Sequence, residues 1–230
     1  MKIAVISDIH GNLEALKKVL EDIEKRDVEN IICAGDLVGY GPYQNEVIEY
    51  ISSKNVLLIG GNYDRAVASN DVKYIKDSDF NRNFALPWSV EKVTEKNKKL
   101  LKRLPESLTL TVNNKVIKIV HGSPTKVNQY LFEDGEDTKE IMESFDGDVL
   151  VCAHTHLPFI KEFGTKLLIN DGSVGKPKIG SHNITYALIN IDDKVSAEIV
   201  ELKHDNTPLI EELKKLNVHE AVIKSFVNGE

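Results

Sequence analysis

The first third of the chain alternates short apolar runs with amphipathic stretches, and this alternation limits the folds available to it. Residues 2–7 ("KIAVIS") and residues 30–36 ("NIICAGD") are mostly apolar and rich in β-branched side chains, as expected for buried strands. Residues 12–26 between them place leucine and isoleucine at helical spacing. A second helix over 42–53 and a third strand over 55–61 continue the rhythm. This alternation of strand and helix predicts crossover units and a largely parallel sheet.

The rest of the chain predicts helices and antiparallel hairpins. A long helical stretch covers residues 78–108, and the pair Asn113-Asn114 suits the positive φ of a tight hairpin turn. We predict hairpins over 108–122, 158–173 and 184–202, a short helix over 136–145, a strand over 148–154 and a C-terminal helix over 207–230. No repeat or linker interrupts the chain, so residues 1–230 are expected to form one domain.

Charge and cysteine content narrow the classes of function. A formal net charge of −7 disfavours an extended nucleic acid as partner, although it is compatible with a nucleotide whose phosphates meet metal ions. Cys33 and Cys152 each lie inside an apolar run, which predicts two buried thiols in a reducing compartment rather than a disulfide. No run has the length of a signal-peptide core or a membrane span, so we expect a cytoplasmic protein without a membrane partner.

Side chains of the kinds that bind metal ions follow five of the apolar runs. Ligands of open α/β sheets bind beyond the carboxyl ends of the strands, so neighbouring strands are expected to bring these side chains to one edge. The residues are Asp8, His10, Asp36, Asn62, His121, His154 and His156. A turn, capping or loop position explains each of them equally well when it is taken alone. Their recurrence after five successive runs favours a shared site.

The donor set indicates which metals such a site would take. It offers nitrogen and oxygen without thiolate, which suits Mn²⁺, Fe, Zn²⁺ or Ni²⁺. Seven donors are too many for one structural zinc, which is closed by four. They suit two metals that share a bridging ligand and keep positions open for water and substrate, an arrangement that supports phosphoryl displacement.

Five motifs in these positions resemble those of a known family. "SDIHGN", "GDLVGYG", "GNYD", "HGSP" and "AHTH" are similar, in this order, to the motifs of the calcineurin-like metallophosphoesterases, from Ser7 to about Gly175. The resemblance is greatest to the small bacterial and archaeal phosphodiesterase branch, which includes dinucleoside polyphosphate hydrolase-like members. It implies an α/β fold, a four-layer α-β-β-α sandwich of two mixed sheets flanked by helices. It also implies two divalent metal ions, most often Mn²⁺.

The resemblance assigns the donors to two metals. Asp8, His10 and His156 would hold the first metal, and Asp36 would bridge to the second. The second would be completed by Asn62, His121 and His154. On this interpretation Asn62 ends its strand in an amide, because the carbonyl oxygen can bind a hard cation without adding negative charge.

The sequence departs from the family pattern at Tyr63. Many family members have a histidine there, which protonates the leaving group or stabilises the transition state, and the following acid, here Asp64, orients it. A tyrosine hydroxyl, with an ordinary pKa of about 10, is a poor acid at neutral pH. Tyr63 therefore either takes part in catalysis or only packs at the rim of the site. In both cases we expect acidic leaving groups, as in aryl esters and phosphoanhydrides.

Four further residues are candidates for substrate contact. Tyr40 in "GYGP" is expected to line the pocket unless it only shapes a tight turn. Arg65 can pair with a phosphate oxygen, although a surface ion pair is the stronger interpretation. His182 lies in the loop "KPKIGSHN", and Asn12 stands where the first predicted helix needs an N-cap.

Four other charged side chains are expected to lie outside the site. Lys176 and Lys178 follow "DGSVG" and are predicted to face solvent, while His204 and His219 are not expected to bind metal.

The leading hypothesis for function is a metal-dependent phosphoesterase that hydrolyses a small phosphodiester or phosphoanhydride, with a nucleotide among the candidate substrates. One alternative is a phosphoprotein or phosphomonoester phosphatase, although the chain is short of insertions for peptide recognition. Another is a catalytically weak scaffold of the same fold that binds partner proteins; Tyr63 favours it modestly and the complete donor set disfavours it. The sequence makes no prediction of the oligomeric state.

Overall fold

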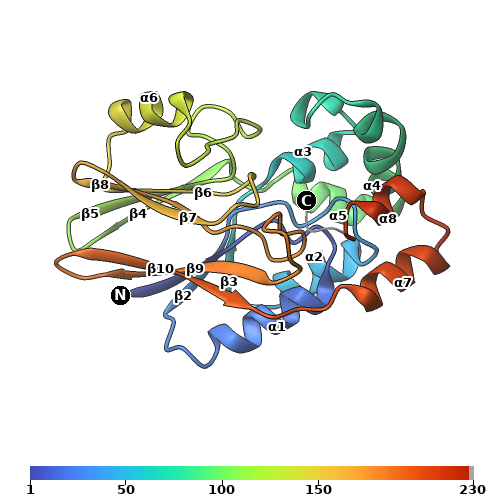
Figure 1. The fold of residues 1–230 in the computed structure, drawn as a ribbon, viewed down its shortest axis with the longest axis horizontal. Coiled ribbons are helices and arrows are strands. Elements are labelled where there is room, and N and C mark those ends of the chain that lie inside the picture. The colour runs from blue at the N-terminus through green and yellow to red at the C-terminus, as the bar shows by residue number, and fades with distance from the viewer. Residues whose placement is uncertain (228–230) are drawn as a thin grey trace.

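Two five-stranded sheets pack face to face, with helices on their outer surfaces (Figure 1). The computed structural model describes residues 1–227, and the last three positions of the predicted C-terminal helix lie outside the described residues. Helices α1 (Leu13–Ile23) and α2 (Gln44–Ser52) cover the outside of one sheet, and α6 (Glu136–Ser144) covers the outside of the other (Figure 1). The predicted α-β-β-α sandwich of two mixed sheets is confirmed.

The first sheet contains the predicted crossover units. Strand β1 pairs in parallel with β2, which pairs in parallel with β3, and the hairpin β9–β10 joins antiparallel to β1. The elements are β1 (Lys2–Ile6), α1 (Leu13–Ile23), β2 (Asn30–Cys33), α2 (Gln44–Ser52), β3 (Val56–Leu58), α3 (Asn62–Ser69), β9 (Ile184–Ile191) and β10 (Val195–Leu202). Because the parallel strands point the same way, the turns after β1, β2 and β3 meet at one end of the sheet.

The second sheet is built mostly from hairpins, as predicted. Its order is β4-β5-β6-β8-β7, with β5, β6 and β8 parallel to one another. The elements are β4 (Ser107–Val112), β5 (Lys115–Val120), α6 (Glu136–Ser144), β6 (Val149–Cys152), β7 (Phe159–Phe163) and β8 (Lys166–Asn170). The turn between β4 and β5 places Asn113 and Asn114 at φ of 49° and 60°, which confirms the predicted tight hairpin.

Strand β1 packs on both of its faces, which explains its unbroken apolar sequence. Ile3 and Val5 point into the layer between the two sheets, where they meet strands of the second sheet. Ala4 and Ile6 point the other way, into the core beneath α1 and α2. Both layers are dry, so each side chain contributes by burial.

The helical middle is broken where the sequence predicts continuity. Its pieces are η1 (Val72–Tyr74), η2 (Asn81–Ala85), α4 (Leu86–Lys92) and α5 (Glu95–Leu101), and η2 is wound as a π-helix. Val93 is extended, and Thr94 caps α5 by accepting the N–H of Asn97 at 3.3 Å. The threonine thus starts a new helix instead of continuing the old one.

The C-terminal stretch is likewise divided. Helices α7 (Thr207–Lys215) and α8 (Glu220–Lys224) replace the single predicted helix. Asn217 between them adopts a φ of 52°, a conformation that an α-helix cannot contain.

Two further expectations concern the state of the cysteines and membrane-spanning helices. Cys33 and Cys152 are buried free thiols, as predicted. No helix within residues 1–227 combines the length and the apolar character needed to cross a membrane.

Candidate metal centre

The candidate ligands stand on strained turns beyond the strands. Asp8 and His10 follow β1 with φ of 51° and 48°, and Asp36 follows β2 with a φ of 55°. His154 and His156 follow β6 with φ of 67° and 61°. This left-handed conformation costs non-glycine residues roughly 1 kcal/mol or more each. Such a concentration of strain is typical of sites whose side-chain directions matter more than local stability.

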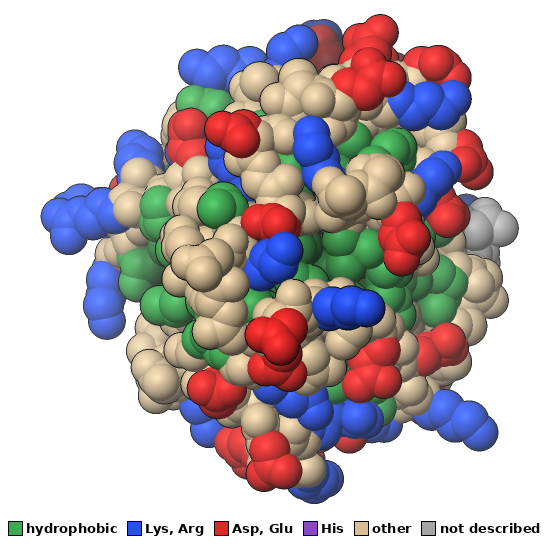
Figure 2. All heavy atoms as spheres, turned by 90° about the vertical axis from the view of Figure 1, so that its left-hand side faces the viewer, with side chains coloured by type: hydrophobic (Ala, Val, Ile, Leu, Met, Phe, Trp, Pro, Cys, Tyr) green, Lys and Arg blue, Asp and Glu red, His purple; other side chains and the backbone are tan. Residues whose placement is uncertain are grey.

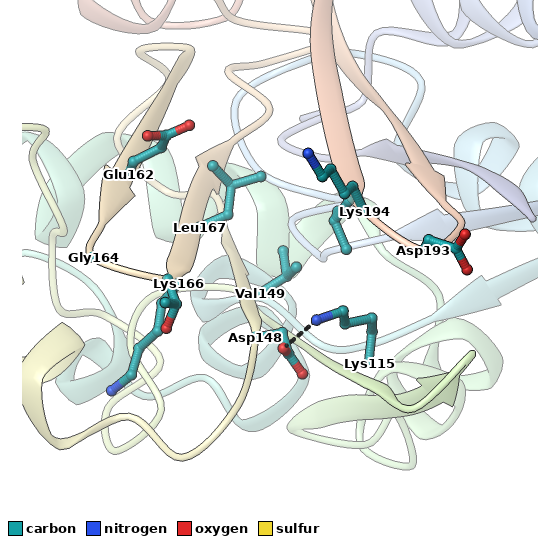
Figure 3. Close-up of a pocket in the computed structure, with 11 residues that line it drawn as sticks. Lys115, Asp148, Val149, Glu162, Gly164, Lys166, Leu167, Asp193 and Lys194 are labelled. Atoms are coloured by element: carbon teal, nitrogen blue, oxygen red, sulfur yellow. Dashed lines mark hydrogen bonds and ion pairs between the residues drawn. The ribbon is translucent and has the colours of Figure 1, made fainter.

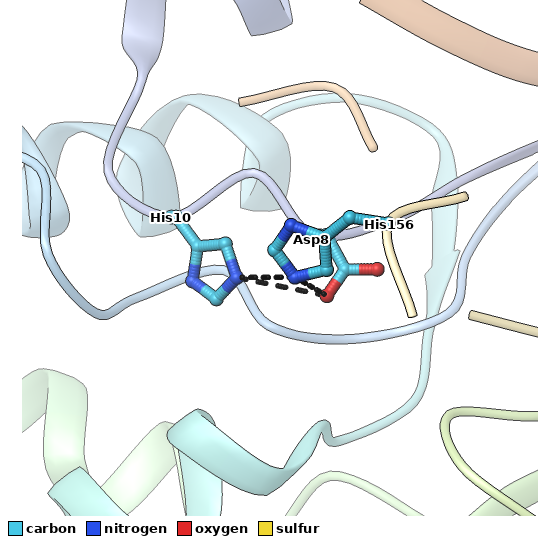
Figure 4. A group of neighbouring side chains, drawn as sticks. All are labelled: Asp8, His10 and His156. Atoms are coloured by element: carbon cyan, nitrogen blue, oxygen red, sulfur yellow. Dashed lines mark hydrogen bonds and ion pairs between the residues drawn. The ribbon is translucent and has the colours of Figure 1, made fainter. Parts of the chain in front are cut away.

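The first group of donors comprises Asp8, His10 and His156 (Figure 4). The Nε2 atom of His156 lies 3.2 Å from Asp8 Oδ1, and that of His10 lies 3.6 Å from the same oxygen. The two Nε2 atoms are 3.3 Å apart. Metal bonds of about 2.0–2.2 Å place neighbouring ligands about 3–3.5 Å apart, so these three residues fit one cation.

The second group of donors surrounds His121. Its Nε2 atom lies 2.8 Å from Asn62 Oδ1 and 3.5 Å from Asp36 Oδ2. The same Asp36 oxygen lies 3.7 Å from His10 Nε2 in the first group. The other oxygen, Oδ1, accepts the backbone N–H of Tyr63 at 2.8 Å. Asp36 therefore turns one oxygen toward the space between the two groups, where a bridging ligand belongs.

His154 lies beside the second group without joining it. Its ring centroid is 5.1 Å from that of His121 and 4.1 Å from the stacked ring of Tyr130. Its Nε2 atom is buried without a hydrogen-bond partner, and so is Asp8 Oδ1. Buried polar atoms of this kind are costly unless a partner binds them, so both atoms fit a cation that would complete the centre.

Backbone carbonyls fix the orientation of three histidines. The Nδ1 atoms of His10 and His121 lie 2.9 Å from Val38 O and 2.8 Å from Ala34 O. The Nδ1 atom of His156 similarly meets the carbonyl of Lys176. Because a carbonyl only accepts, each Nδ1 carries a proton, and each ring turns its Nε2 atom toward the centre.

Electrostatics keep most of these donors ready for a cation. Burial lowers the pKa of His154 to about 3 and that of His156 to about 4, so both stay neutral. His121 differs: burial lowers its pKa, but the Asp36 and Asp8 carboxylates outweigh burial and raise it to about 10. A divalent cation would take the place of that proton between His121 and Asp36.

Asp64 holds two of the turns together. One of its oxygens accepts the N–H groups of Gly61 and Asp36 at 2.9 Å each. The other accepts those of Leu37 at 2.9 Å and Val38 at 3.3 Å. The residue is fully buried, and burial raises its pKa to about 6. Its place is therefore beneath the centre, where it positions Asp36.

Glycine is required where these two turns touch. A Cβ at Gly61 would lie 2.1 Å from Asp36 Oδ1, and one at Gly35, whose φ is +97°, would lie 2.4 Å from the nitrogen of Gly61. Only hydrogen side chains allow this approach.

The structure corrects two predictions about how the donors are assembled. Asn62 does not end its strand: β3 stops at Leu58, and Asn62 is the first residue of α3. The donors also do not share the edge of one sheet. β1, β2 and β3 belong to the first sheet, while β5 and β6 belong to the second, so the centre lies across the ends of both.

Tyr63 is tied into the structure by its hydroxyl. It donates a 2.6 Å hydrogen bond to Asn81 Oδ1, and the amide nitrogen of Asn81 donates to Lys76 O at 2.7 Å. Burial raises the pKa of Tyr63 well above its ordinary value. This hydrogen bond thus links α3 to η2.

The other predicted contact residues are placed differently from one another. Tyr40 lines the pocket over the donor groups. Arg65 lines a different cavity and pairs with Glu106 at 3.7 Å, in line with the surface ion pair. His182 Nε2 lies 2.9 Å from Val227 O, away from the donors. Asn12 is buried and caps α1 by accepting the N–H of Ala15 at 3.2 Å.

Asn12 has no hydrogen-bond donor left for a phosphate oxygen. Its amide nitrogen donates to Gly175 O at 3.1 Å and to Asn206 Oδ1 at 3.0 Å. His204 and His219 belong to neither donor group, and His219 instead caps α8 through Ala221 N.

The pocket above the donors contains residues that the sequence does not predict to lie at the site. It has a volume of about 50 Å³, room for a few ions or water molecules. Besides the candidates above it is lined by Lys76, Asn81, Tyr130, Lys176 and Lys178. The prediction that Lys176 faces solvent is wrong, since only 7% of it is exposed. The small residues of "DGSVG" were the available signal: a Cβ at Gly175 would lie 1.8 Å from Ile9 O, so this loop runs against the β1 turn.

A larger cavity, of about 500 Å³, lies at the opposite end of the sandwich (Figure 3). It is lined by the first residues of β5 and β8 and the turn between β9 and β10. Lys115 pairs there with Asp148 at 3.1 Å, and Lys166 donates to carbonyls at the end of α6. In Figure 2 this face mixes acidic and basic side chains around an apolar hollow, and no histidine of the described residues is visible on it. Lys115 and Lys166 are thus engaged within the protein.

Replacing Asp64 by asparagine is expected to loosen both turns. The new amide nitrogen cannot accept the two N–H groups that one carboxylate oxygen accepts, and each buried donor left unpaired costs about 1–3 kcal/mol. We expect the free energy of unfolding to fall by about 2–4 kcal/mol and the affinity for Mn²⁺ to fall about tenfold or more. Urea unfolding and calorimetric titration measure these quantities.

Asp71→Asn is the matched control. Asp71 caps the exposed η1 with one hydrogen bond, from Lys73 N at 3.0 Å, so less than about 1 kcal/mol is expected and no change in Mn²⁺ affinity. Equal effects of the two substitutions would show that Asp64 does not hold the centre.

Comparison with known proteins agrees with this geometry. Residues 1–194 match the calcineurin-like phosphoesterase superfamily domain. The chain is 35% identical to the uncharacterized protein MJ0912 of Methanocaldococcus jannaschii, over 93% of this chain and 92% of that protein. It is 26% identical to phosphodiesterase YfcE of Escherichia coli K12, over 84% and 89%.

A solved structure covers the whole chain. Hypothetical protein PH1004 of Pyrococcus horikoshii superposes with a TM-score of 0.89 at 26% identity, covering 100% of this chain and 98% of that one. The chain therefore belongs to the calcineurin-like phosphoesterase superfamily.

Proposed function

We propose that the chain is a metal-dependent hydrolase of small phosphate esters that acts on a phosphodiester or a phosphoanhydride. The observation that carries this proposal is the pair of donor groups joined by Asp36, whose Oδ2 atom lies 3.7 Å from His10 Nε2 and 3.5 Å from His121 Nε2. Two such groups a few ångströms apart suit two divalent cations that share one carboxylate. The name of the relative from Escherichia coli, phosphodiesterase YfcE, supports the same reaction class.

Each donor has a defined part in this proposal. Asp8, His10 and His156 hold one cation, and Asn62, His121 and His154 hold the other, with Asp36 between them. Nitrogen and oxygen donors without thiolate suit Mn²⁺, with Fe, Zn²⁺ and Ni²⁺ as alternatives. When bound, the cations supply activation of water and neutralisation of phosphoryl charge. The protein fixes the direction of these donors. Backbone carbonyls orient the histidine rings, and backbone N–H groups hold the carboxylates of Asp36 and Asp64.

The pocket limits the substrate to one that presents an exposed phosphoryl group. A volume of about 50 Å³ admits the reacting phosphoryl group beside the donors, while the groups attached to it lie toward the rim of the pocket. No residue in the usual histidine position can donate a proton readily, because the Tyr63 hydroxyl is buried and donates to Asn81. Substrates with acidic leaving groups are therefore favoured. The buried free thiols of Cys33 and Cys152 suit a reducing, cytoplasmic compartment.

The test is hydrolysis by chelator-stripped protein with Mn²⁺ added back. Asp36→Asn should lower the rate on bis(p-nitrophenyl) phosphate by at least about two orders of magnitude, because one carboxylate serves both donor groups. Asp27→Asn is the control: Asp27 is also an aspartate at positive φ, 53°, but lies exposed after α1. Full activity of Asp36→Asn, or a rate independent of added metal, would contradict the proposal.

Substrates of other classes separate the alternatives in the same assay. The panel contains an activated monoester, a cyclic nucleotide, a dinucleoside tetraphosphate and a phosphopeptide. Preference for the monoester or the phosphopeptide would establish a phosphatase instead. No turnover of any substrate by metal-loaded protein would favour the scaffold.

Tyr63→Phe tests whether the tyrosine is a proton donor. General acids contribute about 10²–10⁴-fold, and most to poor leaving groups. Since the Tyr63 hydroxyl is engaged with Asn81, we expect the dependence of rate on leaving-group acidity to stay unchanged across a series of aryl phosphodiesters. Loss of the hydrogen bond should lower the free energy of unfolding by about 1 kcal/mol. A steeper dependence on leaving-group acidity in the variant would show that Tyr63 does protonate the leaving group.

A further inference from the structure

Three lysines line the pocket above the donor groups without a carboxylate partner. They are Lys76, which follows η1, and Lys176 and Lys178, which follow β8. Within residues 1–227, every ion pair that a lysine forms belongs to another lysine, so none of these three has a carboxylate partner there. Lys73, three positions before Lys76, pairs with Asp71 at 2.9 Å. The chain as a whole has a net charge of −7, whereas three lysines gather positive charge around this one pocket.

The lysines are held at the pocket by the structure. The Nζ atom of Lys176 lies 5.1 Å from the ring centroid of Tyr40, another residue of the pocket wall. The backbone of Lys176 accepts from His156 Nδ1, and the N–H of Lys178 donates to His156 O at 3.3 Å. Lys178 lines the same pocket two positions further along the chain.

Lys76 is placed through Tyr63. The Tyr63 hydroxyl donates to Asn81, and Asn81 donates to the carbonyl of Lys76, so one chain of hydrogen bonds ties the Lys76 segment to the residue after Asn62. Asn81 is also the first residue of the π-helix η2, and such irregular turns recur at functional sites. The tyrosine thus supports a lysine in the region where the expected histidine would have supplied a proton.

The charges of the pocket exceed what a simple diester can balance. Three ammonium groups match the carboxylates of Asp8, Asp36 and Asp64 in number, and every divalent cation held there would add two more positive charges. A phosphodiester carries a single negative charge. A phosphoanhydride carries further negative oxygens on the neighbouring phosphoryl group, at the distance of one bridging oxygen.

We propose that Lys76, Lys176 and Lys178 form a subsite for a second phosphoryl group next to the reacting one, so that the substrate class is a phosphoanhydride. This inference rests on the proposed function of the centre. In the reaction the oxygen of water forms a bond to the attacked phosphorus, and the bond from that phosphorus to the bridging oxygen breaks. The electron pair stays on the departing phosphate, and the proton of water goes to solvent.

This subsite explains how the site works without a proton donor at position 63. The departing phosphate is a weak base and leaves as an anion, and ammonium groups placed beside it stabilise the charge that develops on its bridging oxygen. An alkoxide leaving group would gain far less from the same lysines, because it needs a proton.

The first arm of the test compares two inhibitors of bis(p-nitrophenyl) phosphate hydrolysis at fixed free Mn²⁺: inorganic phosphate and pyrophosphate. Pyrophosphate should inhibit at least about tenfold more tightly, the worth of one or two charge-assisted contacts. Lys178→Met should reduce this ratio about fivefold or more, whereas Lys73→Met, a lysine paired with Asp71 and outside this pocket, should leave it unchanged. Circular dichroism verifies that each variant is folded.

The second arm measures binding without catalysis. Calorimetric titration of metal-stripped protein with pyrophosphate and with phosphate should show the same preference, lost in Lys178→Met and kept in Lys73→Met. Equal affinity for the two anions in the unaltered protein, or an undiminished preference in Lys178→Met, would overturn the subsite. If the diester is not hydrolysed with any metal, the proposed function fails, and this arm still decides whether the lysines bind a diphosphate.

Discussion

The candidate centre depends on one buried carboxylate that binds no metal in the proposed assignment. Asp64 accepts four backbone N–H groups, from Gly61, Asp36, Leu37 and Val38, and so fastens the turn after β2 to the start of α3. Together with the hydrogen bond from the Tyr63 N–H to Asp36 Oδ1, these bonds hold Asp36 and Asn62 at their mutual distance. The two glycines at the contact, Gly35 and Gly61, are needed for the same reason, since a side chain on either would displace the turn.

The sandwich makes a site of this size possible because two sheets contribute to it. One sheet alone would supply Asp8, His10, Asp36 and Asn62 and leave one side open. The second sheet brings His121, His154 and His156 from β5 and β6, so histidine nitrogens from one sheet meet carboxylate oxygens from the other. Packing of apolar side chains between the sheets, Ile3 and Val5 among them, holds these ends in register. The stability of the core thus sets the geometry of the centre.

Much of this was predictable from the sequence because the signals are local. Each signal predicts the local structure of a few neighbouring residues. Examples are the apolar runs, the spacing of leucines in α1 and the Asn113-Asn114 turn. The contacts made across the fold were harder to predict: the small residues before Lys176 indicate a close approach of backbone, but they do not identify the turn after β1 as the partner. The same holds for the hydrogen bond of Tyr63 to Asn81, which spans 18 positions. It also holds for Asn62, which follows two glycines and begins a helix instead of ending the strand.

Anomalous X-ray scattering from crystals grown with Mn²⁺ tests the central claim most directly, because it locates each ion regardless of turnover. Two peaks are expected, one about 2.0–2.3 Å from donor atoms of Asp8, His10 and His156, the other at that distance from Asn62 and His121, with Asp36 touching both. A single peak, or peaks away from Asp36, would contradict a two-metal centre.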